Sequence, residues 1–179
     1  MLRRWRRRLE KSKNGGTKNQ WAAWVSMALM FYGLLRGSEV IGRQGKREGL
    51  RWSNVTFLYK DGKLDAVDLF IERSKTDAFG FGATVRIFLD DDEPANPVRW
   101  LHEKFKEEGP EGTSFVAEGA TKGKAVSYYL VNSSVQQAAK LEGENGEDWG
   151  THSGRAGGNC PAAPACGPVG AAHADASCV

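Results

Sequence analysis

The most hydrophobic part of the chain is the run at residues 21–35 (WAAWVSMALMFYGLL). A membrane span needs ~20 apolar residues, whereas this run is shorter and contains Ser26 and Gly33. It therefore predicts a helix that is buried in a protein core and ends near Leu35. Thr17 or Asn19 is suitably placed to cap the start of this helix.

The polar segments that follow predict a helical turn and then a loop. Ser38 and Glu39 open a short helical turn, and Arg36 lies between this turn and the long helix. Residues 43–49 (RQGKREG) include two glycines and four charged residues. Because glycine and charged side chains favour irregular, solvated backbone, we expect a loop there.

Three short runs rich in Val, Ile, Phe and Thr are typical of β-strands, at residues 55–59, 66–72 and 84–89. The first two are joined by Lys60-Asp61-Gly62-Lys63, and an Asp-Gly pair between strands is typical of a tight hairpin. The link to the third run carries Lys75 near its start. We therefore expect a small three-stranded antiparallel sheet.

Two further helices are expected in the second half of the chain. Pro97 suits the first position of a helix, and Val98, Leu101 and Phe105 then share one face at helical spacing. Residues 127–141 form a second amphipathic segment. The predicted elements together indicate an α+β fold that is mainly helical.

Charge is unevenly distributed along the 179 residues, which are enough for one domain. The net charge is +3, but residues 1–18 carry +7 and the remainder carries −4. Two interpretations of this basic arm stay open: a solvated, disordered segment, or a segment that contacts phosphate. Its arginines, which are the candidate DNA contacts, are Arg3, Arg4, Arg6, Arg7 and Arg8.

Metal and disulfide chemistry find little support in the sequence. The three cysteines all lie in residues 159–179, a segment dominated by Ala, Pro, Gly and Cys that we expect to be disordered, and none forms a CxxC pair. The acidic residues 90–93 lack histidine partners and predict a solvated loop in preference to a metal site. His102 lies in an ordinary surface helix and receives no role.

The pair His152 and Arg155, in GTHSGR, says little alone, because residues three apart share a helix face in many proteins. The order of motifs is more specific. Arg36 and Glu39 in YGLLRGSEV are followed by LRWSNV, a strand pair with Lys75 after it, a helical region and GTHSGR. This succession resembles the catalytic domain of the tyrosine recombinase (phage integrase) family, and GTHS with a glycine pair behind it looks like members from eukaryotic mobile elements.

The resemblance implies three parts of the chain and one class of partner. Residues 1–18 form the basic arm, residues 19–158 an incomplete integrase-like catalytic domain, and residues 159–179 the tail. Double-stranded DNA is the implied partner, a homo-oligomer on DNA stays open, and no membrane is expected. The protein would act in the nucleus of a eukaryote or in the cytoplasm of a bacterium.

The resemblance also assigns roles to individual residues. It makes Arg36 and Arg155 the phosphate-binding arginines and Glu39 the support of Arg36, with Lys75 and His152 completing the catalytic set. Guanidinium groups stay charged at any working pH and bind phosphate oxygens through two bonds. A histidine can move the proton of the nucleophile, and a lysine can protonate the leaving 5′ oxygen. Such a site requires no metal or other cofactor, because the arginines supply the positive charge.

The sequence departs from the family after Arg155. Family members carry a second His or Trp there and then the tyrosine that attacks DNA, whereas all four tyrosines of this chain lie before Arg155. Two of them, Tyr128 and Tyr129, are expected to serve helix packing. The segment 43–49 is a further departure, since it is an insertion. A frameshift, an altered splice or a gene-model error just after Gly158 would produce such a tail.

Three hypotheses therefore stay open. The first is the catalytic domain of a recombinase that breaks and rejoins DNA through a covalent phosphotyrosine, here truncated and expected to be inactive. The second is a non-catalytic, DNA-binding remnant. The third is an unrelated α+β protein, which would be preferred if Arg36, Lys75, His152 and Arg155 failed to converge.

Overall fold

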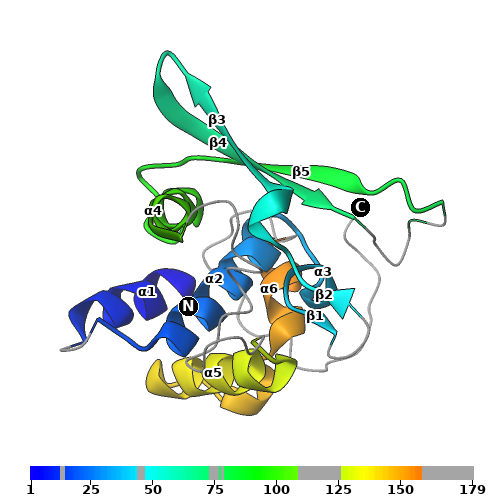
Figure 1. Ribbon diagram of the computed structural model, residues 1–179. Coiled ribbons are helices and arrows are strands. Elements are labelled where there is room, and N and C mark those ends of the chain that lie inside the picture. The colour runs from blue at the N-terminus through cyan, green and yellow to red at the C-terminus, as the bar shows by residue number, and fades with distance from the viewer. Residues whose placement is uncertain (13–14, 44–46, 73–76, 78, 109–125, 159–179) are drawn as a thin grey trace, which may run out of the picture.

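A computed structural model describes residues 1–12, 15–43, 47–72, 77, 79–108 and 126–158, with backbone alone at 42–43, 47–48, 108 and 155–158. Helices and a small antiparallel sheet make up this part of the chain, so the predicted α+β fold is confirmed (Figure 1). The sheet lies at one side of the molecule, and most helices gather on the other. The expected disorder of residues 159–179 falls outside the described residues.

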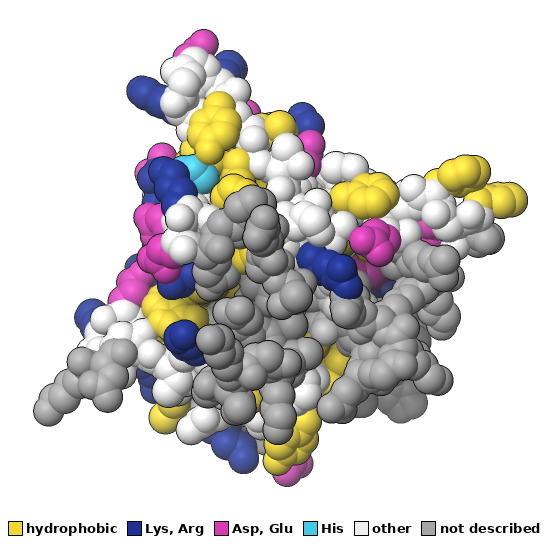
Figure 2. Space-filling model, in the orientation of Figure 1, with side chains coloured by type: hydrophobic (Ala, Val, Ile, Leu, Met, Phe, Trp, Pro, Cys, Tyr) yellow, Lys and Arg dark blue, Asp and Glu magenta, His cyan; other side chains and the backbone are white. Residues whose placement is uncertain are grey.

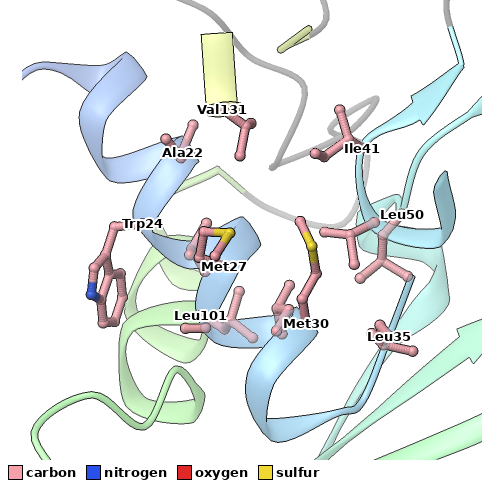
Figure 3. Close-up of a cluster of buried hydrophobic side chains, with 14 of the residues drawn as sticks. Ala22, Trp24, Met27, Met30, Leu35, Ile41, Leu50, Leu101 and Val131 are labelled. Atoms are coloured by element: carbon pink, nitrogen blue, oxygen red, sulfur yellow. The ribbon is translucent and has the colours of Figure 1, made fainter. Parts of the chain in front are cut away.

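Helix α2 (Lys18–Tyr32) is the buried helix that the sequence predicts. Thr17 caps it: the Thr17 hydroxyl accepts a hydrogen bond from the Gln20 backbone N–H, and the Gln20 side chain accepts one from the Thr17 backbone N–H. Every residue from Ala22 to Met30 is buried. Side chains of α2 such as Met27 and Met30 pack among residues of several other elements (Figure 3).

Helix α2 ends three residues before the expected Leu35. Gly33 forms its C-cap, and Leu34 then takes a left-handed backbone conformation with φ 52°. This reversal turns the chain away from the helix axis. The short helix α3 (Gly37–Val40) follows, one residue earlier than the expected turn at Ser38.

Residues 2–11 form helix α1 (Leu2–Lys11). A disordered arm was one of the two interpretations that the sequence left open for this segment. Trp5 and Leu9 are each only 4% exposed and belong to the hydrophobic core. The helix packs beside α2, where the Trp24 indole N–H donates to the Leu2 carbonyl at 3.2 Å. The disordered interpretation is wrong for these residues, because the two apolar side chains at helical spacing provide an apolar face that the charge count conceals.

Strands β3 (Val55–Lys60), β4 (Lys63–Ile71) and β5 (Ala83–Phe88) form the expected antiparallel sheet in the order β3-β4-β5. Asp61 and Gly62 both have positive φ, as a two-residue hairpin of this kind requires. Helix α4 (Val98–Glu108) covers one face of the sheet, with the Phe57 and Phe105 ring centroids 5.3 Å apart.

Residues 43, 47 and 48 lie in strands, where the sequence predicts a loop over 43–49. Strands β1 (Gly42–Arg43) and β2 (Arg47–Glu48) form a two-residue antiparallel ladder, so the loop expectation is wrong for those positions. A 3-10 helix, η1 (Trp52–Asn54), then leads into β3. Charged residues can occupy a short, peripheral ladder, which is why composition did not reveal it.

The last described elements are α5 (Tyr128–Leu141), the 3-10 helix η2 (Gly146–Asp148) and α6 (Thr151–Gly158). Ser127 caps α5 by accepting a hydrogen bond from the Leu130 N–H, in agreement with the predicted amphipathic segment. Helix α6 lies between α2 and α3 in Figure 1. Among the described residues, no helix has the length and apolar character that crossing a membrane demands.

Replacement of Trp5 by alanine tests whether α1 belongs to the folded domain. Because the indole is buried, we expect Trp5→Ala to lower the free energy of unfolding by about 3–5 kcal/mol. The control is Arg7→Ala on the exposed side of the same helix, which should change it by less than about 0.5 kcal/mol. Equal, small effects of both changes in urea unfolding would mean that α1 is not docked in solution.

Candidate functional site

The candidate site starts from Arg36, at the reversal between α2 and α3. Leu35 anchors the chain there, since it is buried at 3% exposure. The Arg36 backbone N–H donates to Glu39 Oε2 at 2.7 Å, and the Arg36 guanidinium donates to Glu39 Oε1 at 3.2 Å. The Glu39 side chain is 7% exposed and that of Arg36 is 30% exposed. A shielded carboxylate thus holds an arginine that still reaches solvent, in the arrangement that the resemblance assigns to this pair.

Tyr128, the first residue of α5, lies directly against the backbone of Gly37. A Cβ atom built on Gly37 would lie 2.5 Å from the Tyr128 hydroxyl oxygen and 2.9 Å from Cζ. Only glycine therefore fits beside this phenol without displacing it. The sequence-based expectation that Tyr128 and Tyr129 both serve helix packing is wrong for Tyr129, which is 83% exposed, while Tyr128 contacts the Arg36 turn.

Helix α6, which carries His152, packs closely on α2 through Gly154. A Cβ atom on Gly154 would lie 3.0 Å from Met30 Cβ and 3.2 Å from Met27 Cε, so a glycine there allows the two helices to approach. His152 is two residues before Gly154, on a different side of the helix, and its side chain is exposed. The helix therefore buries its glycine and leaves its histidine accessible.

Helix α5 connects the two halves of the site. Asn132 Oδ1 accepts a hydrogen bond from the Thr151 backbone N–H at 3.2 Å, at the start of α6. Tyr128 and Asn132 are four residues apart, so they occupy neighbouring positions on one face of α5, ~5–6 Å apart at their Cβ atoms. One turn of α5 thus contacts both Gly37, beside Arg36, and Thr151, beside His152. The first arginine motif and the helix of the His-x-x-Arg motif therefore both contact the N-terminal part of α5.

Two members of the predicted set cannot be placed. Lys75 lies outside the described residues, and Arg155 is described by its backbone alone, in α6 three residues after His152. Among the described residues, Arg36 and Glu39 are in contact, and the Arg36 turn and the start of the His152 helix each contact α5. The convergence of all four predicted catalytic residues stays a prediction.

The arginines of α1 take part in contacts within the molecule that the sequence did not reveal. Four of them pair with carboxylates, and the Arg6 guanidinium also donates to the Pro94 carbonyl and lies 5.5 Å from the centre of the Trp24 ring. Arg3, Arg4, Arg7 and Arg8 are exposed, so pairing with a carboxylate leaves Arg3, Arg4 and Arg8 still open to solvent. The carboxylate pairs are Arg3–Glu93, Arg6–Glu10 and Arg8–Glu142, with Arg4 3.6 Å from Glu142.

These pairs change how the basic arm is understood. Positive charge counted along residues 1–18 is partly balanced in space by acids from distant segments, such as Glu93 and Glu142. Burial raises the pKa of Glu93, but the bond from Arg3 and the Ala95 N–H outweigh it, so the net pKa is lowered. Figure 2 shows Lys and Arg intermixed with Asp and Glu on the visible face. On that face the described residues do not form one continuous basic patch.

The acidic residues 90–93 are divided between two environments. Asp90, Asp91 and Asp92 are exposed, as the expected solvated loop requires, while Glu93 is partly buried and fixes α1. Within the described part of the chain, no group of three or more His, Cys, Asp or Glu side chains is arranged to hold a metal ion.

His102, which received no role, has a local structural partner. Its Nε2 atom lies 2.8 Å from the Tyr59 hydroxyl, and burial lowers the pKa of the imidazole.

A separate cavity of about 230 Å³ lies between α1 and α5, lined by residues that include Trp5, Leu9 and Ala138. It is smaller than the ~300–1,000 Å³ typical of small-molecule sites, and it is not lined by Arg36 or His152.

Sequence reasoning missed an exposed aromatic loop before β5. Phe79 and Phe81 are 86% and 81% exposed, and their ring centroids lie 5.9 Å apart. Asp77 shapes the loop by accepting backbone N–H bonds, and the bond from Gly82 is the largest cause of its lowered pKa. Figure 2 shows hydrophobic side chains projecting where this loop leads into β5. The signal available in the sequence was FGFG, four residues that combine aromatic rings with flexible glycines.

The arrangement at Arg36 is suited to binding an anion. Arg36 supplies a permanent charge that Glu39 orients, and the Tyr128 phenol lies against the backbone of Gly37. Phosphate oxygens are bound in this way by Arg, Tyr and His side chains in many proteins. No protein-family model, curated protein or solved structure matches this chain. The family resemblance therefore rests on the order of the sequence motifs.

A double-mutant cycle tests the contact between Gly37 and Tyr128. Alanine normally favours helix over glycine, but the added methyl group would collide with the phenol. We expect Gly37→Ala to lower the free energy of unfolding by about 1–3 kcal/mol. In a Tyr128→Ala background the same change should be neutral or stabilising. An equal cost of Gly37→Ala in both backgrounds would show that the phenol does not occupy this place.

A pair of substitutions at Leu34 tests the strained reversal that presents Arg36. Leu34 has φ 52° and is 43% exposed, so glycine should be more stable than alanine there by about 1 kcal/mol, because alanine keeps the strain. The control is Gln137, exposed within α5, where alanine should be more stable than glycine by about the same amount. Thermal unfolding of the four variants measures both differences. If alanine is more stable than glycine at position 34, as it is expected to be at position 137, the left-handed conformation of Leu34 is contradicted.

Proposed function

We propose that this chain is a DNA-binding protein of the tyrosine recombinase type, related to DNA recombination or integration. Arg36, supported by Glu39, and the start of the His152 helix bind a phosphodiester of double-stranded DNA. Lys75 and Arg155 complete the proposed set on the basis of the sequence motifs. The 179-residue chain binds DNA without cutting it.

One observation carries the proposal. The Arg36 turn and the first turn of α6 lie more than a hundred residues apart in sequence, yet the same turn of α5 contacts both. This shared contact with one turn of α5 is what supports treating the two motifs as parts of one site. The Arg36 side chain is partly exposed and the His152 side chain is exposed, so a large ligand such as a duplex can reach both.

Duplex binding measured by fluorescence anisotropy at several salt concentrations tests this function. The affinity should fall as salt rises, because bound cationic side chains release counterions from DNA. Arg36→Ala should weaken binding about tenfold and lower the slope of log K against log salt by about 0.9, the value for one phosphate contact. Arg36→Lys should keep most of the slope but lose affinity, since lysine lacks the two-bond fork.

Arg99→Ala is the matched control for these titrations. Arg99 is an exposed arginine of α4 that pairs with Asp91, so its removal also deletes one surface charge. We expect wild-type affinity and slope from this variant. Salt-independent binding by the wild type, or equal effects of Arg36→Ala and Arg99→Ala, would contradict the proposed function.

Strand cleavage is the second test. A well-oriented nucleophile accounts for roughly 7–11 kcal/mol of barrier reduction, and in this sequence no tyrosine follows Arg155. We therefore expect the purified 179-residue chain to form no covalent adduct on suicide DNA substrates, which trap phosphotyrosine. A denaturation-resistant adduct mapped by mass spectrometry to Tyr128 or Tyr129 would refute the non-cleaving assignment.

A further inference from the structure

We propose that the outward face of α1 is a second DNA-binding surface, which holds the phosphate backbone of a duplex through Arg4, Arg7, Arg8 and Lys11. We call these four residues the basic stripe. This inference rests on the proposed function and adds to it a surface that lies apart from Arg36, since α1 and α3 lie on opposite sides of α2 in Figure 1. Three features of α1 support it: the spacing of the four cations, the contacts that they make, and the burial of the other face of the helix.

The four cations lie on one side of α1. Residues 4, 7, 8 and 11 follow the i, i+3, i+4, i+7 spacing of a helix face, and all four are exposed. Between residues 4 and 11 a helix rises ~10 Å, at ~1.5 Å per residue. Duplex DNA carries one negative charge per ~1.7 Å of its axis. A stripe of this length therefore spans several phosphates.

The contacts of the basic stripe leave it positively charged. Among the described residues, neither Arg7 nor Lys11 forms an ion pair or a side-chain hydrogen bond. Arg4 and Arg8 approach one and the same carboxylate, that of Glu142, at 3.6 Å and 2.6 Å. Their side chains are still 70% and 44% exposed. Because two of the four cations share one carboxylate, most of the charge of the stripe is available to an outside anion.

The other two arginines of α1 serve the fold. Arg3 pairs with Glu93 and Arg6 pairs with Glu10, and the Arg6 guanidinium also donates to the Pro94 carbonyl. Glu10 is the one acidic residue in the sequence of α1, so the basic stripe itself contains no acid. The helix thus separates the arginines that dock it from the cations that face solvent.

Burial of the opposite face decides which kind of anion α1 can bind. Trp5 and Leu9 are each 4% exposed and belong to the core. A basic helix binds a membrane surface by burying an apolar face among the lipids, and the apolar face of α1 is already packed against the domain. Docking also holds the backbone of the stripe in place, which lowers the entropy lost when a regular polyanion binds. A duplex, whose charges repeat along a stiff backbone, fits this surface.

The double variant Arg7→Gln/Lys11→Gln tests the basic stripe in the full chain, by anisotropy with a labelled duplex at several salt concentrations. Glutamine removes both charges and is nearly as good a helix former as arginine or lysine. We expect duplex binding to weaken at least about tenfold, and the slope of log K against log salt to fall by about 1.8, twice the value for one phosphate contact. The loss should be equal for two duplexes of unrelated sequence, because phosphate contacts carry no sequence information.

The matched control is Arg99→Gln/Lys106→Gln, which removes two exposed cations from α4. Lys106 lies in the last turn of α4, as Lys11 lies in the last turn of α1, so both double variants remove a cation from a helix end. We expect wild-type affinity and slope from this control. Binding of the same proteins to vesicles of phosphatidylcholine and phosphatidylglycerol is measured in parallel, and the double variant in α1 should not differ from the wild type there.

The outcomes separate this inference from the proposed function. Salt-dependent duplex binding by the wild type, with an unchanged slope in Arg7→Gln/Lys11→Gln, would overturn the α1 surface and leave the Arg36 site standing. Equal losses in the two double variants would show a general effect of net charge and would also overturn the inference. Weaker vesicle binding with unchanged duplex binding in Arg7→Gln/Lys11→Gln would assign the stripe to a membrane instead. Absence of duplex binding by the wild type would refute the proposed function itself.

Discussion

The burial of α2 on all sides is the constraint on which the rest of the structure depends. Nine consecutive residues, from Ala22 to Met30, are hidden from solvent. Burial of this kind requires a partner on each side of the helix, because an α-helix turns through a full circle in 3.6 residues. The partners include α1, α3, α5 and α6. Removing any of these helices would expose part of α2, which explains why the basic N-terminal segment is folded onto the domain.

The position of the candidate site follows from this packing. The chain leaves α2 through a strained residue, Leu34, and places Arg36 at the edge of the core. Helix α6 approaches α2 at Gly154, where any larger side chain would separate the helices. As a result, the Arg36 turn and the start of α6 both contact α5. Gly37 allows Tyr128 of α5 to pack on the Arg36 turn, and Gly154 allows α6 to pack on α2. Glycine in the motifs thus has a packing role that precedes any chemistry.

Much of the fold could be predicted from the sequence because local patterns determine it. The sheet, the Asp61-Gly62 turn and the cap of α2 at Thr17 each depend on a few adjacent residues. What could not be predicted depends on residues distant in the chain. The pairing of Arg3 with Glu93 spans ninety residues, and it turns an apparently free basic arm into a docked helix.

The candidate site likewise has one part that the sequence predicts and one part that it does not. Arg36 and Glu39 are three residues apart, so their contact follows from local geometry. The place of Tyr128 against Gly37 depends on how α5 crosses the molecule, and no sequence pattern gives that crossing. Helix packing was therefore the natural expectation for Tyr128. The motif order predicts which segments belong to the site, and the structure adds a helix, α5, that contacts two of them.

NMR of the histidine side chains in the presence of DNA tests the central claim most directly. The sequence contains three histidines, so a protein labelled with ¹³C at the imidazole Cε1 gives three signals, which single His→Gln variants assign. If a phosphodiester binds at Arg36 and the start of α6, adding a short duplex should shift the His152 signal in proportion to occupancy. The His102 signal should not move, because that ring is held by Tyr59 against the sheet. A duplex that shifts His102 and leaves His152 unchanged at saturation would contradict the account.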